Sequence, residues 1–257
     1  MNYNYHTHTT RCRHASGTER NYIETAIAAG ITEIGFSEHV PLRFPDGRES
    51  GHRMLMADAE DYITTLRALR EEYKGRANIR IGFEVEYYPL YFKDTLQYVK
   101  ELGAEYLILG QHYIDNEKCY DHSTYTLSDN VADFIEYVNC VVAAMKTGVF
   151  TYVAHPDIIN FGGDEAFYRA EMTRLCQVAK EYDTPLEINL HGIQHNRFYP
   201  SDRFFAIAGE MGVPVTFGMD VHDSASLLDK EQVQRAKEMV ARNKLNYIGM
   251  PRLKPIK

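Results

Sequence analysis

The sequence predicts a single α/β barrel over residues 1–257, and three observations lead to this prediction. Short apolar stretches alternate with helical patterns seven times, and an eighth short apolar stretch follows them. Strands that alternate with helices pair in parallel through right-handed crossovers. No linker or change in composition divides the chain. Finally, most of the expected strands end in His, Glu or Asp, and barrels of this kind carry their active sites at the carboxyl ends of the strands.

The first third of the chain contains two such strand–helix units and opens a third. Residues 2–6 have strand composition, and a helix is expected from Thr18 to Ala29, where Gly30 ends it. The next strand, 33–39, ends in a histidine. Residues 41–57 are rich in proline and glycine and predict a loop, which is the best candidate for a lid over the site. A helix over 58–73 follows.

The rest of the chain repeats this order. Residues 79–86 alternate in character, with Ile79, Ile81, Phe83 and Val85 on one face and Glu84 on the other, above the small Gly82. The expected strands here are 79–86, 106–112, 150–157, 185–192, 214–222 and a short 246–250, and the expected helices are 92–102, 128–147, 165–182, 202–211 and 229–243.

The composition excludes several classes of protein. The net charge is −8 and no basic run is present, which argues against a nucleic-acid-binding surface. No apolar stretch approaches the length of a membrane span, and the polar, histidine-bearing start of the sequence is unlike a signal peptide. The scattered Cys12, Cys119, Cys140 and Cys176 form no CxxC pair, so we expect reduced thiols in a cytoplasmic protein.

The polar residues at the strand ends are of a kind that binds metals. His6 and His8 are two residues apart in a strand, so both side chains point to the same face. Asp220 and His222 repeat this spacing at the end of another strand. Imidazole and carboxylate groups are ligands for zinc, iron or manganese. The complete set of expected ligands is His6, His8, His14, His39, Glu84, His112, His155, Asp220 and His222.

These motifs resemble those of the polymerase-and-histidinol-phosphatase (PHP) metallohydrolase family. The resemblance covers essentially the whole chain and rests on His6-x-His8 with His14, Ser37-Glu38-His39, Gly82-Phe83-Glu84, Gly110-Gln111-His112, Ala154-His155-Pro156 and Asp220-Val221-His222. The family implies a distorted (β/α)7 TIM-like barrel with three divalent metal ions. The Ser-Glu-His-x-Pro motif, from Ser37 to Pro41, is similar to that of the monofunctional histidinol-phosphate phosphatases. Many relatives have Ser-Asp-Ala-His where this chain has Met219-Asp220-Val221-His222.

The resemblance also implies how the ligands are shared. One ion would be bound by His6, His8, Glu84 and Asp220; the second by Glu84, His112 and His155; the third by His14, His39 and His222. Three divalent ions bring a charge of about +6 and the two carboxylates offset about −2, so the pocket would attract a phosphate dianion. Our hypothesis is that a hydroxide bridging two ions attacks phosphorus in line, with Asp220 or His222 as the proton donor to the leaving alkoxide.

Contacts to a small phosphorylated substrate are expected from other residues. Arg197 can bind phosphate with two N–H groups, and Arg43 lies in the 41–57 loop. Asn189 and His191 are expected to point inward at the end of a strand. Glu117 is one of several carboxylates that could bind a substrate amine. We expect His52, His122 and His195 to be loop residues without a metal role, and Cys12 to be a loop residue and not a ligand.

Other functions remain open at this point. A phosphodiesterase or exonuclease and a phosphotyrosine phosphatase are alternatives within the same family. A domain that binds metal without catalysis, as a structural or protein-binding module, is an alternative of another class, although such a chain is expected to have lost ligands and all nine positions are filled here. A TIM-barrel amidohydrolase also begins with His-x-His, but the bridging lysine expected after its fourth strand is missing from this sequence.

Overall fold

The structure is a computed structural model that describes residues 1–117 and 123–256. Cys119 and His122 therefore lie outside the described residues. In the described part of the chain, eight parallel strands form one sheet in the order of the sequence. They are β1 (Tyr3–Asn4), β2 (Glu33–His39), β3 (Asn78–Val85), β4 (Tyr106–Leu109), β5 (Phe150–Val153), β6 (Leu186–Asn189), β7 (Pro214–Gly218) and β8 (Asn246–Tyr247). The sheet curls into a barrel, which confirms the predicted fold class.

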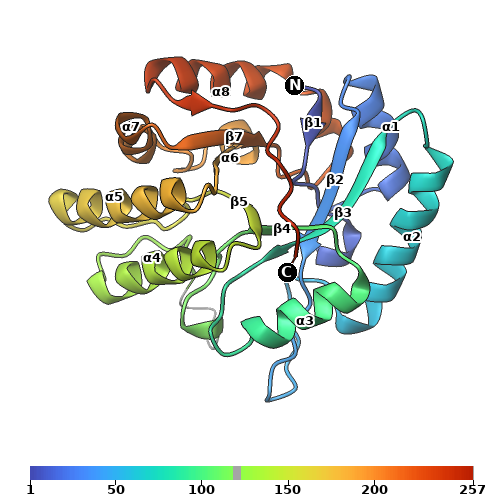
Figure 1. The fold of residues 1–257 in the computed structure, drawn as a ribbon, viewed down its shortest axis with the longest axis horizontal. Helices are drawn as coiled ribbons and strands as arrows, with labels where there is room; N and C mark the ends of the chain where they lie inside the picture. Colours follow the sequence, from blue (N-terminus) through green and yellow to red (C-terminus); the bar gives the residue numbers. More distant parts are fainter. Residues whose placement is uncertain (118–122, 257) are drawn as a thin grey trace.

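Helices cover the outside of the curled sheet (Figure 1). They are α1 (Glu19–Ala28), α2 (Ala59–Glu72), α3 (Phe92–Leu102), α4 (Val131–Lys146), α5 (Glu165–Glu181), α6 (Leu190–Gln194), α7 (Asp202–Met211) and α8 (Lys230–Arg242). Within residues 1–117 and 123–256, 3-10 turns accompany them: η1 (Thr10–Cys12), η2 (Met56–Asp58), η3 (Asp115–Glu117) and η5 (Ser224–Leu228). Most strands end earlier than we predicted. Strand β6 stops at Asn189, because its side chain accepts a hydrogen bond from the N–H of Gly192 and begins α6.

Two apolar regions hold the barrel together. The larger one lies between the strands and the helices and extends along the chain from Tyr22 to Leu245. The smaller one consists of Tyr3, Tyr5, Tyr106, Ile108, Tyr152 and Ala154, and Leu253 packs against it. Three parallel strands, β1, β4 and β5, together with their direct extensions, supply these six residues. Aromatic side chains therefore account for much of the small inner core, which gives a structural role to part of the high tyrosine content.

The barrel closes through the segments that follow β1 and β7. Thr7 and Val221 form an isolated parallel bridge, in which the N–H of His8 donates to the carbonyl of Val221 at 2.9 Å and the N–H of Val221 donates to the carbonyl of His6 at 3.1 Å. At the opposite end of the strands, the Tyr3 hydroxyl donates to the carbonyl of Gly249 at 2.8 Å. The closing bridge thus lies directly between the His6-x-His8 and Asp220-x-His222 pairs.

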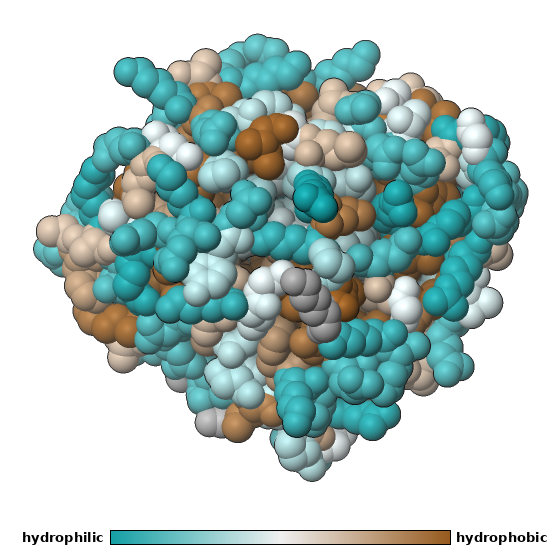
Figure 2. Space-filling view, in the orientation of Figure 1, coloured by the Kyte–Doolittle hydropathy of each residue, from teal (hydrophilic) through white to brown (hydrophobic). Residues whose placement is uncertain are grey.

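The outer surface is predominantly hydrophilic on the face shown in Figure 2, with apolar side chains scattered between polar ones. Among the described residues, no helix combines the length and the apolar character needed to cross a bilayer.

Candidate metal centre

The structure brings all nine expected ligands to the carboxyl ends of the strands. Glu84 of β3 is at the centre of this cluster. Its Oε2 lies 3.4 Å from His6 Nε2, 3.3 Å from His8 Nε2 and 3.1 Å from His39 Nδ1. Its Oε1 lies 3.0 Å from His155 Nε2 and 3.5 Å from His112 Nε2. One carboxylate therefore faces five imidazoles.

Asp220 is the second carboxylate of the cluster. Its Oδ1 lies 3.4 Å from His6 Nε2, 3.3 Å from His8 Nε2 and 3.4 Å from His222 Nδ1. His14 is delivered by the loop after η1, and one ring nitrogen from each of His14, His39 and His222 lies within 4.8 Å of the other two. The three groups inferred from the family resemblance are thus close enough in space to act as ligand sets.

The cluster fits divalent metal ions because its converging atoms are not used by the protein itself. His6 Nε2, His8 Nε2, His39 Nδ1 and Glu84 Oε2 are all buried and have no hydrogen-bond partner among the described residues. Leaving buried polar atoms unpaired costs free energy unless a ligand satisfies them. Imidazole nitrogens and carboxylate oxygens at such distances are typical ligands of zinc, iron and manganese.

Charge and burial act against each other at the two carboxylates. Burial opposes the ionisation of Glu84, but His112, His6 and His39 outweigh this effect and hold its pKa well below the usual range. Burial also opposes the ionisation of Asp220, and His6 and His8 lower the pKa of that carboxyl in the same way. Both groups are therefore anionic and suited to bind a cation.

Three further carboxylates orient the histidines from behind. Glu187 Oε1 lies 2.8 Å from His6 Nδ1, Glu38 Oε1 lies 3.3 Å from His8 Nδ1, and Glu86 Oε1 lies 2.9 Å from His112 Nδ1. Such pairs fix the ring orientation and leave Nε2 free to bind a metal. Glu86 shares a strand face with Glu84, so its place beside the ligands could be read from the sequence. The signal for Glu187 was an acidic residue between two apolar neighbours, and Glu38 directly precedes the expected ligand His39.

Backbone geometry around the centre is unusual at several points. His155 has φ of 30° and Asp220 has φ of 52°, values that non-glycine residues rarely adopt and that concentrate at functional sites. Gly110 packs directly against the side chain of Glu84, and a methyl group at this position would collide with Glu84 Oε1. We had expected Gly82 to lie beneath Glu84, but the space beside Gly82 is filled by the ring of Tyr106.

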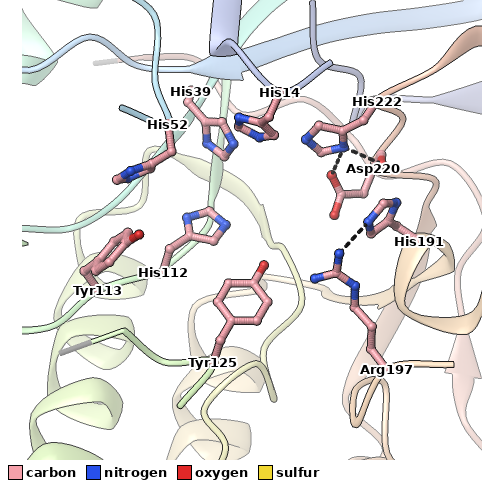
Figure 3. Close-up of a pocket in the computed structure, with 10 residues that line it drawn as sticks. All are labelled: His14, His39, His52, His112, Tyr113, Tyr125, His191, Arg197, Asp220 and His222. Carbon is pink, nitrogen blue, oxygen red and sulfur yellow. Dashed lines mark hydrogen bonds and ion pairs between the residues drawn. The ribbon is translucent and has the colours of Figure 1, made fainter. Parts of the chain in front are cut away.

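A cavity of about 260 Å³ opens beside the cluster (Figure 3). The imidazoles of His14, His39 and His222 lie on one side, and Arg197 and Tyr125 approach from the opposite side. The full lining is His14, His39, His52, His112, Tyr113, Tyr125, His191, Arg197, Asp220 and His222. Of the expected substrate contacts, Arg197 and His191 line this cavity. Sequence reasoning missed Tyr113 and Tyr125, and it predicted the 41–57 loop as a lid without assigning His52 of that loop to the cavity.

Arg197 is held beside the cavity by its neighbours. Its Nη2 donates to His191 Nε2 at 3.1 Å, and its Nη1 donates to the Tyr199 hydroxyl at 3.3 Å. The guanidinium also lies over the ring of Tyr125, 5.6 Å from its centroid. Burial and Arg197 are among the causes that lower the pKa of His191 to about 4, so its neutral ring can accept this hydrogen bond.

Three of the expected substrate contacts are not part of the lining. Arg43 is exposed and lines a separate groove with Tyr98, because its loop turns away from the cluster at this point. Glu117 is fully buried and ion-paired with Arg53. Asn189 is fully buried, and its Nδ2 donates to Glu187 at 2.9 Å and to Asp220 at 3.1 Å. The structure thus corrects the expected roles of Arg43 and Glu117 and gives Asn189 a supporting position behind the ligands.

Cys12 lies closer to the cluster than we expected of a loop residue. Its sulfur, a nitrogen of His8 and a nitrogen of His222 lie within 4.8 Å of one another. The thiol nevertheless donates to the carbonyl of Thr9 at 3.1 Å, and burial raises the pKa of Cys12 to about 12. That Cys12 is not a metal ligand therefore stays a prediction.

The fold and the cluster together define a class of protein, an α/β barrel with a metal centre of histidines and carboxylates at the carboxyl ends of its strands. Within this class, the chain belongs to the PHP domain family, which matches residues 4–191. The matched segment includes the ligands from His6 to His155 and ends before Asp220 and His222.

Individual relatives extend this assignment. The chain is 26% identical over 224 residues to a probable histidinol-phosphatase of Deinococcus radiodurans, covering 84% of this chain and 85% of that protein. It is 26% identical over 252 residues to a histidinol-phosphatase of Bacillus subtilis, covering 86% and 94%. Its fold is similar to the crystal structure of histidinol phosphate phosphatase from Lactococcus lactis complexed with zinc, L-histidinol and phosphate, with a TM-score of 0.76, 18% identity and coverage of 100% and 98%.

Proposed function

We propose that this chain is a metal-dependent phosphomonoesterase that hydrolyses L-histidinol phosphate to L-histidinol and phosphate in histidine biosynthesis. The observation that carries the proposal is the set of unpaired, buried ligand atoms around Glu84, which opens into a cavity that also contains Arg197. The two histidinol-phosphatases that match most of the chain support this choice of substrate. The free, buried thiols of Cys12, Cys140 and Cys176 agree with a cytoplasmic enzyme.

The proposal includes three divalent ions, which we take to be zinc, manganese or iron. His6, His8, Glu84 and Asp220 would hold the first, Glu84, His112 and His155 the second, and His14, His39 and His222 the third. When bound, such ions supply Lewis-acid activation of water and of the phosphoryl group. The distances between these ligand atoms, 3.0–3.5 Å around Glu84, support a shared carboxylate.

The protein's own residues have defined tasks in this proposal. Arg197 binds the phosphoryl oxygens with its guanidinium, and His191 keeps the guanidinium directed into the cavity. Asp220 Oδ1 and His222 Nδ1 lie 3.4 Å apart at the cavity wall, and one of the two relays to the leaving alkoxide the proton that the attacking water gives up. The carboxylates of Glu38, Glu86 and Glu187 hold the histidine rings so that Nε2 points into the cluster.

The test is phosphate release from L-histidinol phosphate by protein loaded with zinc, manganese or iron. p-Nitrophenyl phosphate, a nucleoside monophosphate and bis-p-nitrophenyl phosphate serve as comparison substrates. We expect a clear preference for histidinol phosphate over the other monoesters. Equal, slow rates on all monoesters would refute histidinol phosphate as the substrate but would still show that the protein is a phosphatase. Turnover of the diester alone would indicate a phosphodiesterase, and no turnover by metal-loaded protein would indicate a non-catalytic domain.

A further inference from the structure

We propose that Arg53 is a positioning residue that connects the segment 41–57 to the metal centre by holding Glu86 against His112. The inference rests on the proposed metal-dependent function, because His112 is one of the ligands in that proposal. Neither the sequence motifs nor the lining of the cavity beside the cluster includes Arg53, and its role follows from the hydrogen bonds of its buried guanidinium.

Arg53 is a buried charged residue in a segment that mixes buried and exposed positions. Residues 45–47 of the same segment are exposed, whereas Arg53 is only 2% exposed. Its Nη1 donates to Glu86 Oε2 at 2.9 Å and to the carbonyl of Val40 at 3.1 Å. Its Nη2 donates to Glu86 Oε1 at 3.2 Å and to Glu117 Oε2. One guanidinium thus joins the end of β2, the segment after β3 and the η3 turn.

The contact with Glu86 leads directly to the cluster. Glu86 Oε1, which accepts from Arg53, also lies 2.9 Å from His112 Nδ1, and His112 Nε2 lies 3.5 Å from Glu84 Oε1. The two N–H groups of Arg53 grip both oxygens of Glu86, which fixes the plane of the carboxylate. The orientation of the His112 ring therefore depends on a residue two contacts away.

The other two histidine–carboxylate pairs do not use a cation in this way. Glu187 accepts from the N–H of His155 and from Asn189 Nδ2, both at 2.9 Å. Glu38 accepts from the N–H and the hydroxyl of Thr9 at 2.8 and 2.6 Å. These donors are uncharged and belong to the barrel strands or their immediate continuations. Glu86 alone of the three is held by a charged side chain from the 41–57 segment in the described structure.

The experiment measures zinc affinity of metal-free protein by competition with a chromophoric chelator. We expect Arg53→Met, which removes the guanidinium at similar side-chain length, to weaken zinc binding about tenfold, at the lower end of the range for residues that support metal ligands. Glu86→Gln should weaken it at least as much. In the double variant the two effects should not multiply, because Arg53 acts through Glu86. Arg203→Met is the matched control, since Arg203 bonds Glu165 and the carbonyl of Phe161 on the outer surface.

Two additional variants keep the test decisive. If Arg53→Met does not fold, Arg53→Lys replaces it in the test. Lysine keeps the positive charge but lacks the planar guanidinium that donates to both oxygens of Glu86. We expect this variant to bind zinc at least threefold more weakly than the wild type. Glu117→Gln removes the other carboxylate partner of Arg53 and should change zinc affinity less than Glu86→Gln does. Wild-type zinc affinity in the folded Arg53 variants, or fully multiplicative effects in the double variant, would overturn the inference. Zinc binding without phosphatase activity in the wild type would instead refute the proposed function alone.

Discussion

The metal centre has two sides that are built differently. The strand-held side consists of His6, His8 and Asp220, which lie on either side of the backbone bridge between Thr7 and Val221. The loop-held side consists of His112, Glu86 and Arg53, in which a segment outside the sheet supplies the last contact. Folding of the barrel alone positions the first group. The second group also requires the 41–57 segment to dock, so the two sides should respond differently to mutation and to metal removal.

The largest effect is expected on the strand-held side from His6→Ala. This change removes a nitrogen that faces both Glu84 and Asp220. We expect loss of measurable turnover together with a lower metal content, determined by elemental analysis of the purified protein. Full activity with a full metal complement would show that the hydrolysis does not depend on this centre.

A smaller change at the shared carboxylate tests whether both sides depend on it. In Gly110→Ala the new methyl group would displace Glu84, which faces histidines of both sides. We expect zinc affinity to fall about tenfold or more. Gly162→Ala is the matched control, because its methyl group would approach the flexible side chain of Leu127. Equal zinc affinity of the two variants would contradict the central position of Glu84.

Glu187→Gln tests the strand-held side without replacing any of the expected metal ligands. Glu187 Oε1 faces His6 Nδ1, and a neutral amide in its place is a weaker acceptor for the ring N–H. Replacement of such supporting groups commonly costs about 10–100-fold in metal affinity or activity. The measurement is zinc competition, with Glu165→Gln on α5 as the control. An unchanged affinity would mean that the backbone bridge alone orients His6.

Metal removal should distinguish the two sides within one protein. We expect hydrogen exchange after chelation to accelerate in residues 41–57 more than at the amides of His8 and Val221, which are bonded in the closing bridge. Mass spectrometry of peptides from both regions, with and without zinc, provides the comparison. Faster exchange in the bridge than in the loop would reverse our interpretation.

The smallest effect concerns acid stability of the loop-held side. Burial and, secondly, Arg53 lower the pKa of His52 to about 3. A histidine in the unfolded chain has a pKa near 6.5. Between about pH 6.5 and pH 3, His52 therefore binds a proton in the unfolded chain but not in the folded protein. The free energy of unfolding of the wild type consequently falls as the pH falls through this range. The slope is at most about 1.4 kcal/mol per pH unit, and less here because the side chain is 22% exposed. In metal-free protein, urea unfolding at several pH values should show that His52→Gln lacks this loss. If the free energies of unfolding of the two proteins changed in parallel with pH, this contribution of His52 would be excluded.

The sequence was sufficient to predict the barrel and to place the nine expected ligands together, because strand periodicity and a fixed order of motifs put these residues at one end of a parallel sheet. The partners of the ligands could not be predicted in this way. Which carboxylate faces which Nδ1 depends on the register between strands, as for Glu38, which lies opposite Phe83 in the β2–β3 pair. The position of Arg53 depends on the path of a loop that has no periodic pattern. His191 lies at the cavity on a helix and not on the expected strand, because the side chain of Asn189 caps α6.

The closing bridge has a consequence for the order in which the molecule is made. Tyr3 and Thr216, which form a hydrogen bond, are 213 residues apart, and the bridge between Thr7 and Val221 joins the same two regions. A ribosome releases His6 and His8 early and Asp220 and His222 much later. A nascent chain therefore cannot assemble the strand-held side until β7 has emerged. The complete cluster of histidines and carboxylates thus forms late in biosynthesis, and truncation before β7 would leave His6 and His8 without Asp220.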